Sequence, residues 1–174
     1  LDVTATGYLA EDSMSWLVEG DIRYLDLRAI NMSDVKSKGL LAFKVDADLS
    51  NEFRNMNILA VIDEVDWEME GSAFVASDIN LDFETCDSLT VAQLINDDLS
   101  VKFNSPMSLD SLLFAVDNTM IEIDRQMRLL RLDVDTLQQI IPVFNFAVNA
   151  GNNNMISDYM AVDDISFDSF DLML

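Results

Sequence analysis

The sequence predicts a mainly β protein with a helical insert, in which an antiparallel sheet has one apolar face and one wet face. Two observations predict the sheet: apolar residues alternate with polar ones in several segments, and only five glycines and two prolines interrupt the chain. Successive strand side chains point to opposite faces, so the alternation of apolar and polar residues gives each strand one apolar side and one polar side. A third observation, three-and-four spacing of apolar residues at about residues 105–142, predicts the helical insert.

The predicted strands run along most of the chain. Alternation is strict at 41–49, 79–83, 99–103, 144–150 and 165–167, and weaker strands are expected at 14–18, 22–29 and 58–69. A single face has to collect the apolar members, because a slip of one residue would turn them all to the other side. That shared concave face is the candidate apolar groove, and its residues are Phe43, Val45, Ile79, Leu81, Phe83, Val101, Phe103, Phe144, Phe146 and Val148.

The insert is expected to contain two helices. Ser105 can cap the first, at about 106–130, and Pro106 suits its first position. A short second helix is expected at about 134–141, before Pro142. The first helix has an apolar stripe that is expected to pack on the sheet, although a coiled-coil seam has the same spacing. The stripe consists of Leu109, Leu112, Val116, Met120, Ile123 and Met127.

The composition excludes several kinds of chemistry. With 32 acidic and 10 basic residues and a net charge of -22, the surface repels nucleic acid and anionic lipid headgroups. There is no histidine and Cys86 is the only cysteine, which removes imidazole catalysis and histidine-bound zinc. No carboxylate pair is marked as special and no phosphate-binding loop occurs, so we expect neither catalysis nor a cofactor. Calcium binding stays open, although no Asp pair has the glycine turn of a calcium loop.

The chain is expected to be a single fragment, residues 1–174, of a longer strand-rich protein. Residues 1–5 and 170–174 both look like strands cut in the middle. No apolar run reaches the roughly 18 residues of a membrane span, and no signal peptide is present. We therefore expect the targeting signals to lie elsewhere in the longer protein.

The most individual part of the sequence is the region around the insert. It begins with Ile95-Asn96-Asp97-Asp98-Leu99 and continues through the insert to Pro142-Val143-Phe144-Asn145-Phe146. It then reads Ala150-Gly151-Asn152-Asn153-Asn154, and a further strand-like segment follows at 164–172. This region resembles the middle of the TamB family of translocation and assembly module proteins, in its Bacteroidetes-type branch. The resemblance covers 95–159 and 164–172, and the earlier residues match only in style.

The resemblance implies a fold and a role that the composition alone does not show. TamB proteins are similar to AsmA-like and other bridge-like lipid-transfer proteins, which have a long bent sheet with an apolar groove, a β-taco. The resemblance implies a periplasmic segment of an inner-membrane-anchored protein, with the anchor outside this fragment. The implied partners are phospholipid acyl chains or nascent outer-membrane protein, and a BamA-like outer-membrane partner bound through other parts of the full-length chain. No catalytic residue is carried over, and the helical insert departs from an uninterrupted groove.

Two other functions remain open from the sequence. The apolar faces could close on each other, which would make the chain a purely structural β spacer or an adhesin-like module. Trp16 and Trp67, with the many Asp and Asn residues, are also compatible with a weak glycan-binding or glycan-cleaving domain that uses the wet face. An open apolar face favours the groove, a closed core favours the spacer, and aromatic side chains on the wet face favour a glycan.

Overall fold

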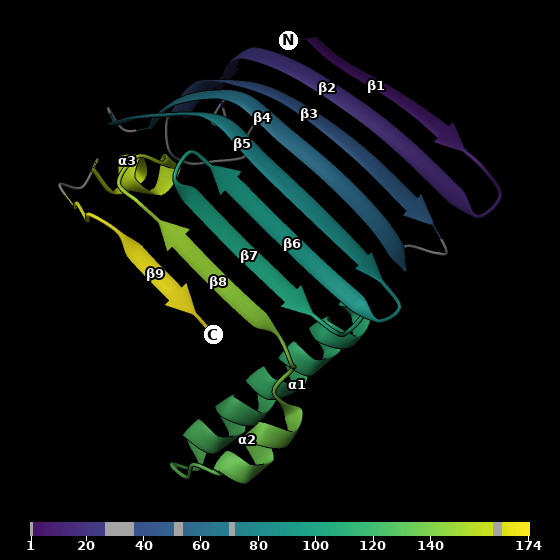
Figure 1. Ribbon diagram of the computed structural model, residues 1–174, viewed down its shortest axis with the longest axis vertical. Coiled ribbons are helices and arrows are strands. Elements are labelled where there is room, and N and C mark those ends of the chain that lie inside the picture. Colours follow the sequence, from purple (N-terminus) through teal and green to yellow (C-terminus); the bar gives the residue numbers. More distant parts are fainter. Residues whose placement is uncertain (1, 27–36, 51–53, 70–71, 162–164) are drawn as a thin grey trace.

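The computed structural model describes residues 2–26, 37–50, 54–69, 72–161 and 165–174, without the side chains of 24–26, 37–38, 67, 69 and 72–74. These residues form one antiparallel sheet of nine strands, whose spatial order is the order of the chain (Figure 1). The mainly β, antiparallel architecture is therefore confirmed. The elements are β1 (Asp2–Leu9), β2 (Ser13–Asp26), β3 (Ser37–Ser50), β4 (Asn55–Met69), β5 (Ser72–Cys86), β6 (Leu89–Asn96), β7 (Leu99–Ser105), α1 (Leu109–Arg128), α2 (Val134–Ile140), β8 (Asn145–Ala150), α3 (Met155–Ala161) and β9 (Phe170–Met173).

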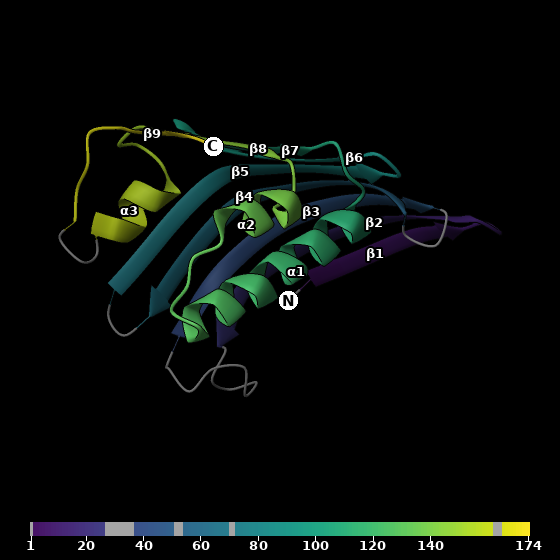
Figure 2. The same cartoon turned by 90° about the horizontal axis from the view of Figure 1, so that it is seen from below.

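The sheet is open and strongly curved. β1 and β9 are its two edges, and Figure 2 shows the strands as an arch with the three helices beneath it. Irregular pairing lies at neighbouring positions of β2 to β5. The β2–β3 register shifts between Ile22 and Leu25, the β3–β4 register shifts between Ala42 and Phe43, and Asp78 in β5 has a φ of 54°. Since an irregularity of this kind bends a strand and increases its twist, we attribute the arch to these adjacent irregularities.

Some predicted strands differ from the observed ones. The segments 14–18 and 22–29 form a single strand, β2, as far as Asp26, and residues 27–29 lie outside the described residues. Residues 165–167 are not a strand, because the Ile165 N–H donates to the Met160 carbonyl at the end of α3 (3.1 Å). β6 was not predicted, since Val91 and Ile95 interrupt the contrast between its faces.

The insert forms a helical hairpin that projects from the end of β7 (Figure 1). Its cap differs from the predicted one: Ser108, not Ser105, accepts a hydrogen bond from the Ser111 N–H (3.3 Å). Ser105 ends β7, where it is buried and its hydroxyl donates to the Val143 carbonyl (2.7 Å). β7 therefore ends at Ser105, the chain bends at residues 106 and 107, and α1 begins at Leu109 rather than at Pro106.

Half of the apolar stripe of α1 is not covered by the sheet. Of its six residues Leu112 is buried, and Leu109 and Ile123 are half-buried. Val116, Met120 and Met127 are 43%, 61% and 68% exposed, so the predicted packing is wrong for these three. The helix packs against α2 instead.

The described part of the protein has a very small closed core. Its buried hydrophobic residues are Ala76, Ile79, Leu99, Leu112 and Ala150. The chain exposes 12011 Å², whereas a compact monomer of 19.6 kDa would expose about 8,600 Å². The excess follows from a single-layered sheet whose two faces are both accessible.

Candidate functional site

Apolar side chains of all nine strands stand side by side in one row across the sheet. The row follows cross-strand pairs, so each member lies directly opposite the next. It spans about 38 Å, because eight intervals of about 4.8 Å separate nine strands. The members of this middle row are Ala5, Val18, Val45, Ala60, Leu81, Leu94, Val101, Val148 and Leu172.

Two further rows flank the middle row on the same face, two residues away along each strand. The first, the aromatic row, consists of Gly7, Trp16, Ala47, Ile58, Phe83, Ala92, Phe103 and Phe146. The second, the outer row, consists of Val3, Gly20, Phe43, Ile62 and Ile79.

The three rows bring together nine of the ten residues that the sequence assigns to the groove. The tenth, Phe144, precedes β8, and its ring stacks on that of Phe103 with a centroid distance of 5.7 Å. Trp16 lies in the aromatic row and not on the wet face, and the side chain of Trp67 lies outside the described residues.

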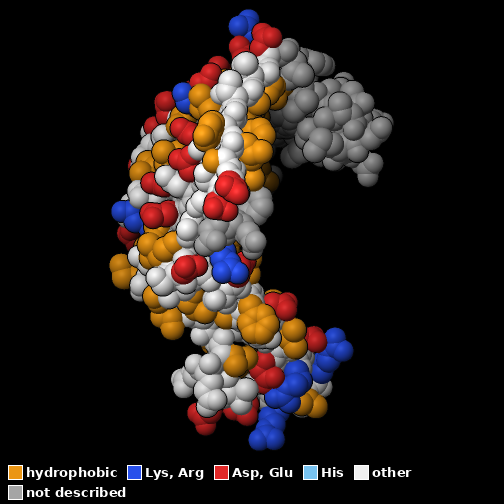
Figure 3. Space-filling model, turned by 90° about the vertical axis from the view of Figure 1, so that its right-hand side faces the viewer, with side chains coloured by type: hydrophobic (Ala, Val, Ile, Leu, Met, Phe, Trp, Pro, Cys, Tyr) orange, Lys and Arg blue, Asp and Glu red, His pale blue; other side chains and the backbone are white. Residues whose placement is uncertain are grey.

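The apolar rows line the inner side of the arch. Thr85 and Asn96 have the same strand parity as the rows, and both bond to helices that lie beneath the arch in Figure 2. The hydroxyl of Thr85 accepts a hydrogen bond from the Leu109 N–H at the start of α1 (3.2 Å). The Oδ1 of Asn96 accepts one from the Met155 N–H at the start of α3 (2.7 Å). The concave face is therefore the apolar one, and the crescent outline in Figure 3 shows its curvature from the side.

Polar side chains bound the apolar face where α1 begins. Thr85, Thr90 and Ser105 pair across β5, β6 and β7 in the row next to the aromatic row, and all three are buried. The hydroxyls of Thr85 and Thr90 are 3.0 Å apart, and the Thr90 hydroxyl donates to the Met107 carbonyl (2.9 Å). Because buried hydroxyls need partners, this row fixes the hairpin to the sheet.

A second polar cluster bounds the face where α3 begins. The side chain of Asn154 is buried; its Nδ2 donates to Asp98 Oδ1 (2.6 Å), and its Oδ1 accepts from the Ser157 N–H (3.1 Å). Asn96 joins the cluster by donating from Nδ2 to the Ser77 carbonyl (2.7 Å). These bonds hold α3 against the turn between β6 and β7, so the apolar rows lie between two ordered polar borders.

Close contacts between strands flatten the aromatic side chains onto the face. A Cβ at Gly20 would collide with the ring of Phe43 on β3, and a Cβ at Gly7 would lie 2.9 Å from the ring of Trp16 on β2. Glycine at these two positions therefore lets each ring lie over the neighbouring strand. The two rings thus cover the backbone of the neighbouring strands, which joins the apolar side chains of adjacent strands on this face.

The convex face is acidic, as alternation requires. The ammonium of Lys44 lies 3.0 Å from the carboxylate of Glu19, which raises the pKa of Lys44 above its usual value by hydrogen bonding and charge attraction. Most other charged residues of β3 to β5 on this face are carboxylates, among them Asp46, Asp48 and Asp82. The two faces thus differ in chemistry as well as in curvature.

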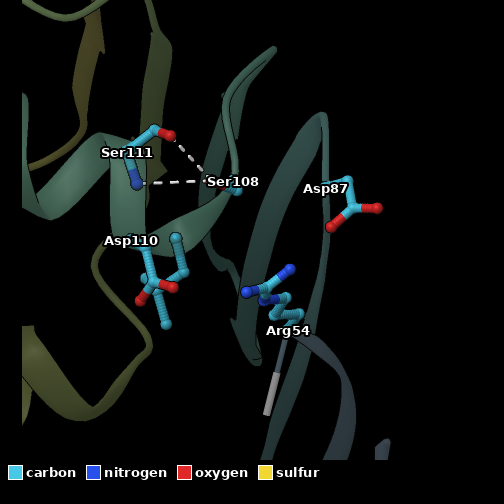
Figure 4. A pocket seen from close by; sticks show the side chains of 6 residues that line it. Arg54, Asp87, Ser108, Asp110 and Ser111 are labelled. Carbon is cyan, nitrogen blue, oxygen red and sulfur yellow. Dashed lines mark hydrogen bonds between the residues drawn. The ribbon is translucent and has the colours of Figure 1, made fainter. Parts of the chain in front are cut away.

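A smaller polar hollow, of about 240 Å³, lies at the start of α1 (Figure 4). Arg54 lies between the carboxylates of Asp87 and Asp110, and in the described part of the chain no ion pair joins it to either of them. Ser108 contacts Ser111 as the cap of α1. The side chains of Arg54, Asp87 and Asp110 are exposed, so the charged groups of this hollow lie in solvent around the start of α1.

Among the described residues, no three His, Cys, Asp or Glu side chains gather in a way that could hold a metal ion. Within the same residues, no helix has both the length and the apolar character to cross a bilayer.

Sequence reasoning found the central apolar residues and missed their neighbours on the outer strands. Val18, Ile58, Ala60, Leu94 and Leu172 lie in the same rows but come from segments with weaker alternation. These residues could have been found from the alternation of side chains along paired strands. If the apolar face of β5 and β7 is known, the residues that pair with it on each neighbouring strand must lie on the same face.

No protein-family model, curated protein or solved structure matches the chain.

Proposed function

We propose that this chain is a non-catalytic periplasmic segment of a TamB-like protein, and that its concave face carries phospholipid acyl chains between membranes. The observation that supports this most directly is the middle row, which is apolar on all nine strands. Monomeric proteins rarely expose a contiguous apolar surface larger than a few hundred Å² unless it is used.

The chemistry of the face fits an acyl chain. Its rows carry aliphatic and aromatic side chains, and contact with them is non-directional, so a chain can slide along the face. Each methylene that leaves water there contributes about 0.8 kcal/mol. Polar headgroups would stay at the open side of the arch in solvent, so little headgroup selectivity is expected.

Assistance to nascent outer-membrane protein is the second candidate, and the same apolar rows favour it, because an unfolded client also has apolar side chains that leave water on contact. A BamA-like partner would then bind through other parts of the full-length chain. The acyl-chain proposal takes precedence because the rows carry apolar side chains only. An acyl chain needs no hydrogen-bond partner there, whereas the backbone of a peptide does.

The test is site-specific photo-crosslinking with adjacent residues that differ only in face. A photoreactive residue at Phe83 or Val101 lies on the concave side, and one at Asp82 or Lys102 lies on the convex side of the same strands. The folded chain is incubated with phospholipid, irradiated and analysed by mass spectrometry. Capture is expected at Phe83 and Val101 and not at Asp82 or Lys102.

Two results would overturn the proposal. Equal capture at both faces would show non-specific contact, and no capture at either face in a correctly folded chain would leave the structural spacer. If an unfolded outer-membrane strand peptide crosslinks at Phe83 and Val101 while phospholipid does not, the client is protein.

A further inference from the structure

The end of the helical hairpin carries exposed leucines among arginines, in an otherwise acidic protein. Residues 125–132 read Arg-Gln-Met-Arg-Leu-Leu-Arg-Leu and contain three of the ten basic residues and no acidic one. The turn between α1 and α2 lies at the lower end of the molecule, away from the strands (Figure 1), and Figure 3 shows basic side chains gathered at that end. This segment is called the hairpin tip below.

The leucines of the tip are not part of the packing between the two helices. Leu130 is 95% exposed, and Leu129, Leu132 and Met127 are also exposed. The contacts that close the hairpin are made by other groups. Gln126 is buried, and its side chain accepts from the Asp133 N–H (2.7 Å) and donates to the Asp133 carbonyl (3.1 Å).

The backbone at Leu130 makes its leucine side chain more unusual. Leu130 has a φ of 49°, the left-handed conformation that follows many helices and that favours glycine. The Arg131 N–H donates to the Gln126 carbonyl and the Leu130 N–H to the Met127 carbonyl, both at 3.1 Å, which is the usual pattern of such a helix end. Folding alone would therefore favour Gly at this position, whereas the chain has a leucine in solvent.

The charges of the tip point away from the sheet along the helix. Arg125 pairs with Glu122 (2.5 Å) and Arg128 with Asp124 (2.8 Å), so each carboxylate lies one turn nearer the sheet than its arginine. Arg131 has no carboxylate at ion-pair distance among the described residues, and its charge acts on Asp133. An anionic surface would attract the tip and repel the acidic remainder of the chain, so the molecule would approach end-on.

We propose that the hairpin tip docks into the interface of an anionic phospholipid bilayer, inserting Leu129, Leu130 and Leu132 beside the headgroups. Leucine in the acyl boundary with arginine at the headgroup level is the arrangement of interfacial membrane segments. An anionic bilayer interface places negative charge directly above an apolar phase, so the arginines and the leucines of one short segment both find their partners there. A second copy of the chain would also attract the arginines, but its sheet carries the carboxylates and the apolar rows on opposite faces. The bilayer is therefore the occupant that matches both kinds of side chain, and self-association is one outcome of the test. The docking is independent of the proposed acyl-chain transport and would bring the lower end of the arch to a membrane.

The test is flotation of the full chain with vesicles of phosphatidylglycerol and phosphatidylethanolamine, and with vesicles of phosphatidylcholine alone. The wild type is expected to float with the anionic vesicles and to dissociate as salt is raised. The variant Leu130→Gly with Leu132→Ser should lower the bound fraction about tenfold, because two leucine side chains no longer leave water. Arg128→Gln with Arg131→Gln should weaken binding to anionic vesicles and reduce its dependence on salt.

Two controls keep the result interpretable. Leu130→Gly replaces a left-handed leucine with the residue that this conformation favours, so circular dichroism should show an intact fold. Leu59→Ser removes an exposed leucine from the convex face of the sheet and should leave flotation unchanged. Lack of flotation by folded wild type, or equal loss with Leu59→Ser, would overturn the proposal. So would tip variants that change self-association in sedimentation velocity without changing flotation.

Discussion

The sheet and the helical hairpin both expose apolar side chains, but the two regions hold them in different ways. In the sheet, backbone pairing fixes nine strands in register and collects the side chains in rows on a concave face. In the hairpin, two helices are joined by a few polar contacts, such as Thr119 to the Ile140 carbonyl (3.1 Å), and much of the apolar stripe faces solvent. The sheet surface is therefore broad and set by many strand pairings, whereas the tip is narrow and depends on a few local contacts.

The largest expected effect tests the closed part of the sheet. Leu99 is only 1% exposed, between Asn96 of β6 and Ala150 of β8. Leu99→Ala should lower the free energy of unfolding by about 2–5 kcal/mol, because it removes contacts and leaves a cavity. Urea denaturation measures the change, and Leu59→Ala, on the convex face, should cost far less. Equal effects of the two substitutions would mean that the sheet has no closed region.

The next effect separates the hairpin from the sheet. Gln126→Leu leaves the Asp133 N–H and carbonyl without their side-chain partner, at a cost of about 1–3 kcal/mol. Amide hydrogen exchange should accelerate in α2 and stay unchanged in β6 and β7 if the hairpin opens on its own. Gln138→Leu, at an exposed position of α2, is the matched control. Faster exchange throughout the sheet would show that the two regions unfold together.

At the hairpin tip a substitution is expected to raise the stability slightly, whereas the two substitutions above lower it. Leu130→Gly should raise the stability of the hairpin by about 1 kcal/mol or less, since glycine has no Cβ penalty in the left-handed conformation. The melting temperature of the helical signal measures it. A clear decrease would mean that the Leu130 side chain contributes to packing, which would also weaken the argument for membrane docking.

The smallest effect concerns acid and the hairpin. Hydrogen bonds from Arg125 and Gln126 lower the pKa of Glu122 from 4.5 to about 2. A lowered carboxyl pKa stabilises the fold above the ordinary value, so this contribution should be present at neutral pH and fade between about pH 4.5 and 2. Helicity of the hairpin, followed by circular dichroism with Glu122→Gln as reference, reports the change. A Glu122 titration midpoint near 4.5 by NMR would contradict the pairing.

The strands that could be predicted are those whose two faces differ strongly in polarity. From Phe43 to Leu49 in β3, and throughout β7, every second residue is polar, as at Lys44, Asp46 and Lys102, and these segments are strands as expected. β6 has Thr90 and Asn96 on its apolar side and Val91 on the other, so its alternation carries no signal. α3 was missed although Asn154 caps it, because one turn-forming asparagine next to Gly151 reads equally as a loop.

The candidate site shows the same division. Alternation is enough to place Val45, Leu81, Phe83 and Val101 on one face, since parity is a local property of an extended chain. It could not give the register, which depends on turn lengths and on irregularities such as the shift between Ala42 and Phe43 in the β3–β4 pairing. The sequence also could not show whether the apolar stripe of α1 would be covered by the sheet, because three-and-four spacing predicts an apolar helix face but not what packs against it.

The sequence by itself determined that this protein is mainly β, acidic on one side and apolar on the other, with a helical insert before β8. Those properties are local, since they follow from side-chain chemistry repeated at the period of a strand or a helix. The tertiary structure alone decided that the apolar side is concave, that no second layer of the described residues closes it, and that the hairpin projects with Leu130 in solvent. These depend on pairing and on a few long-range hydrogen bonds, such as that from Leu109 to Thr85, which join residues far apart in the chain.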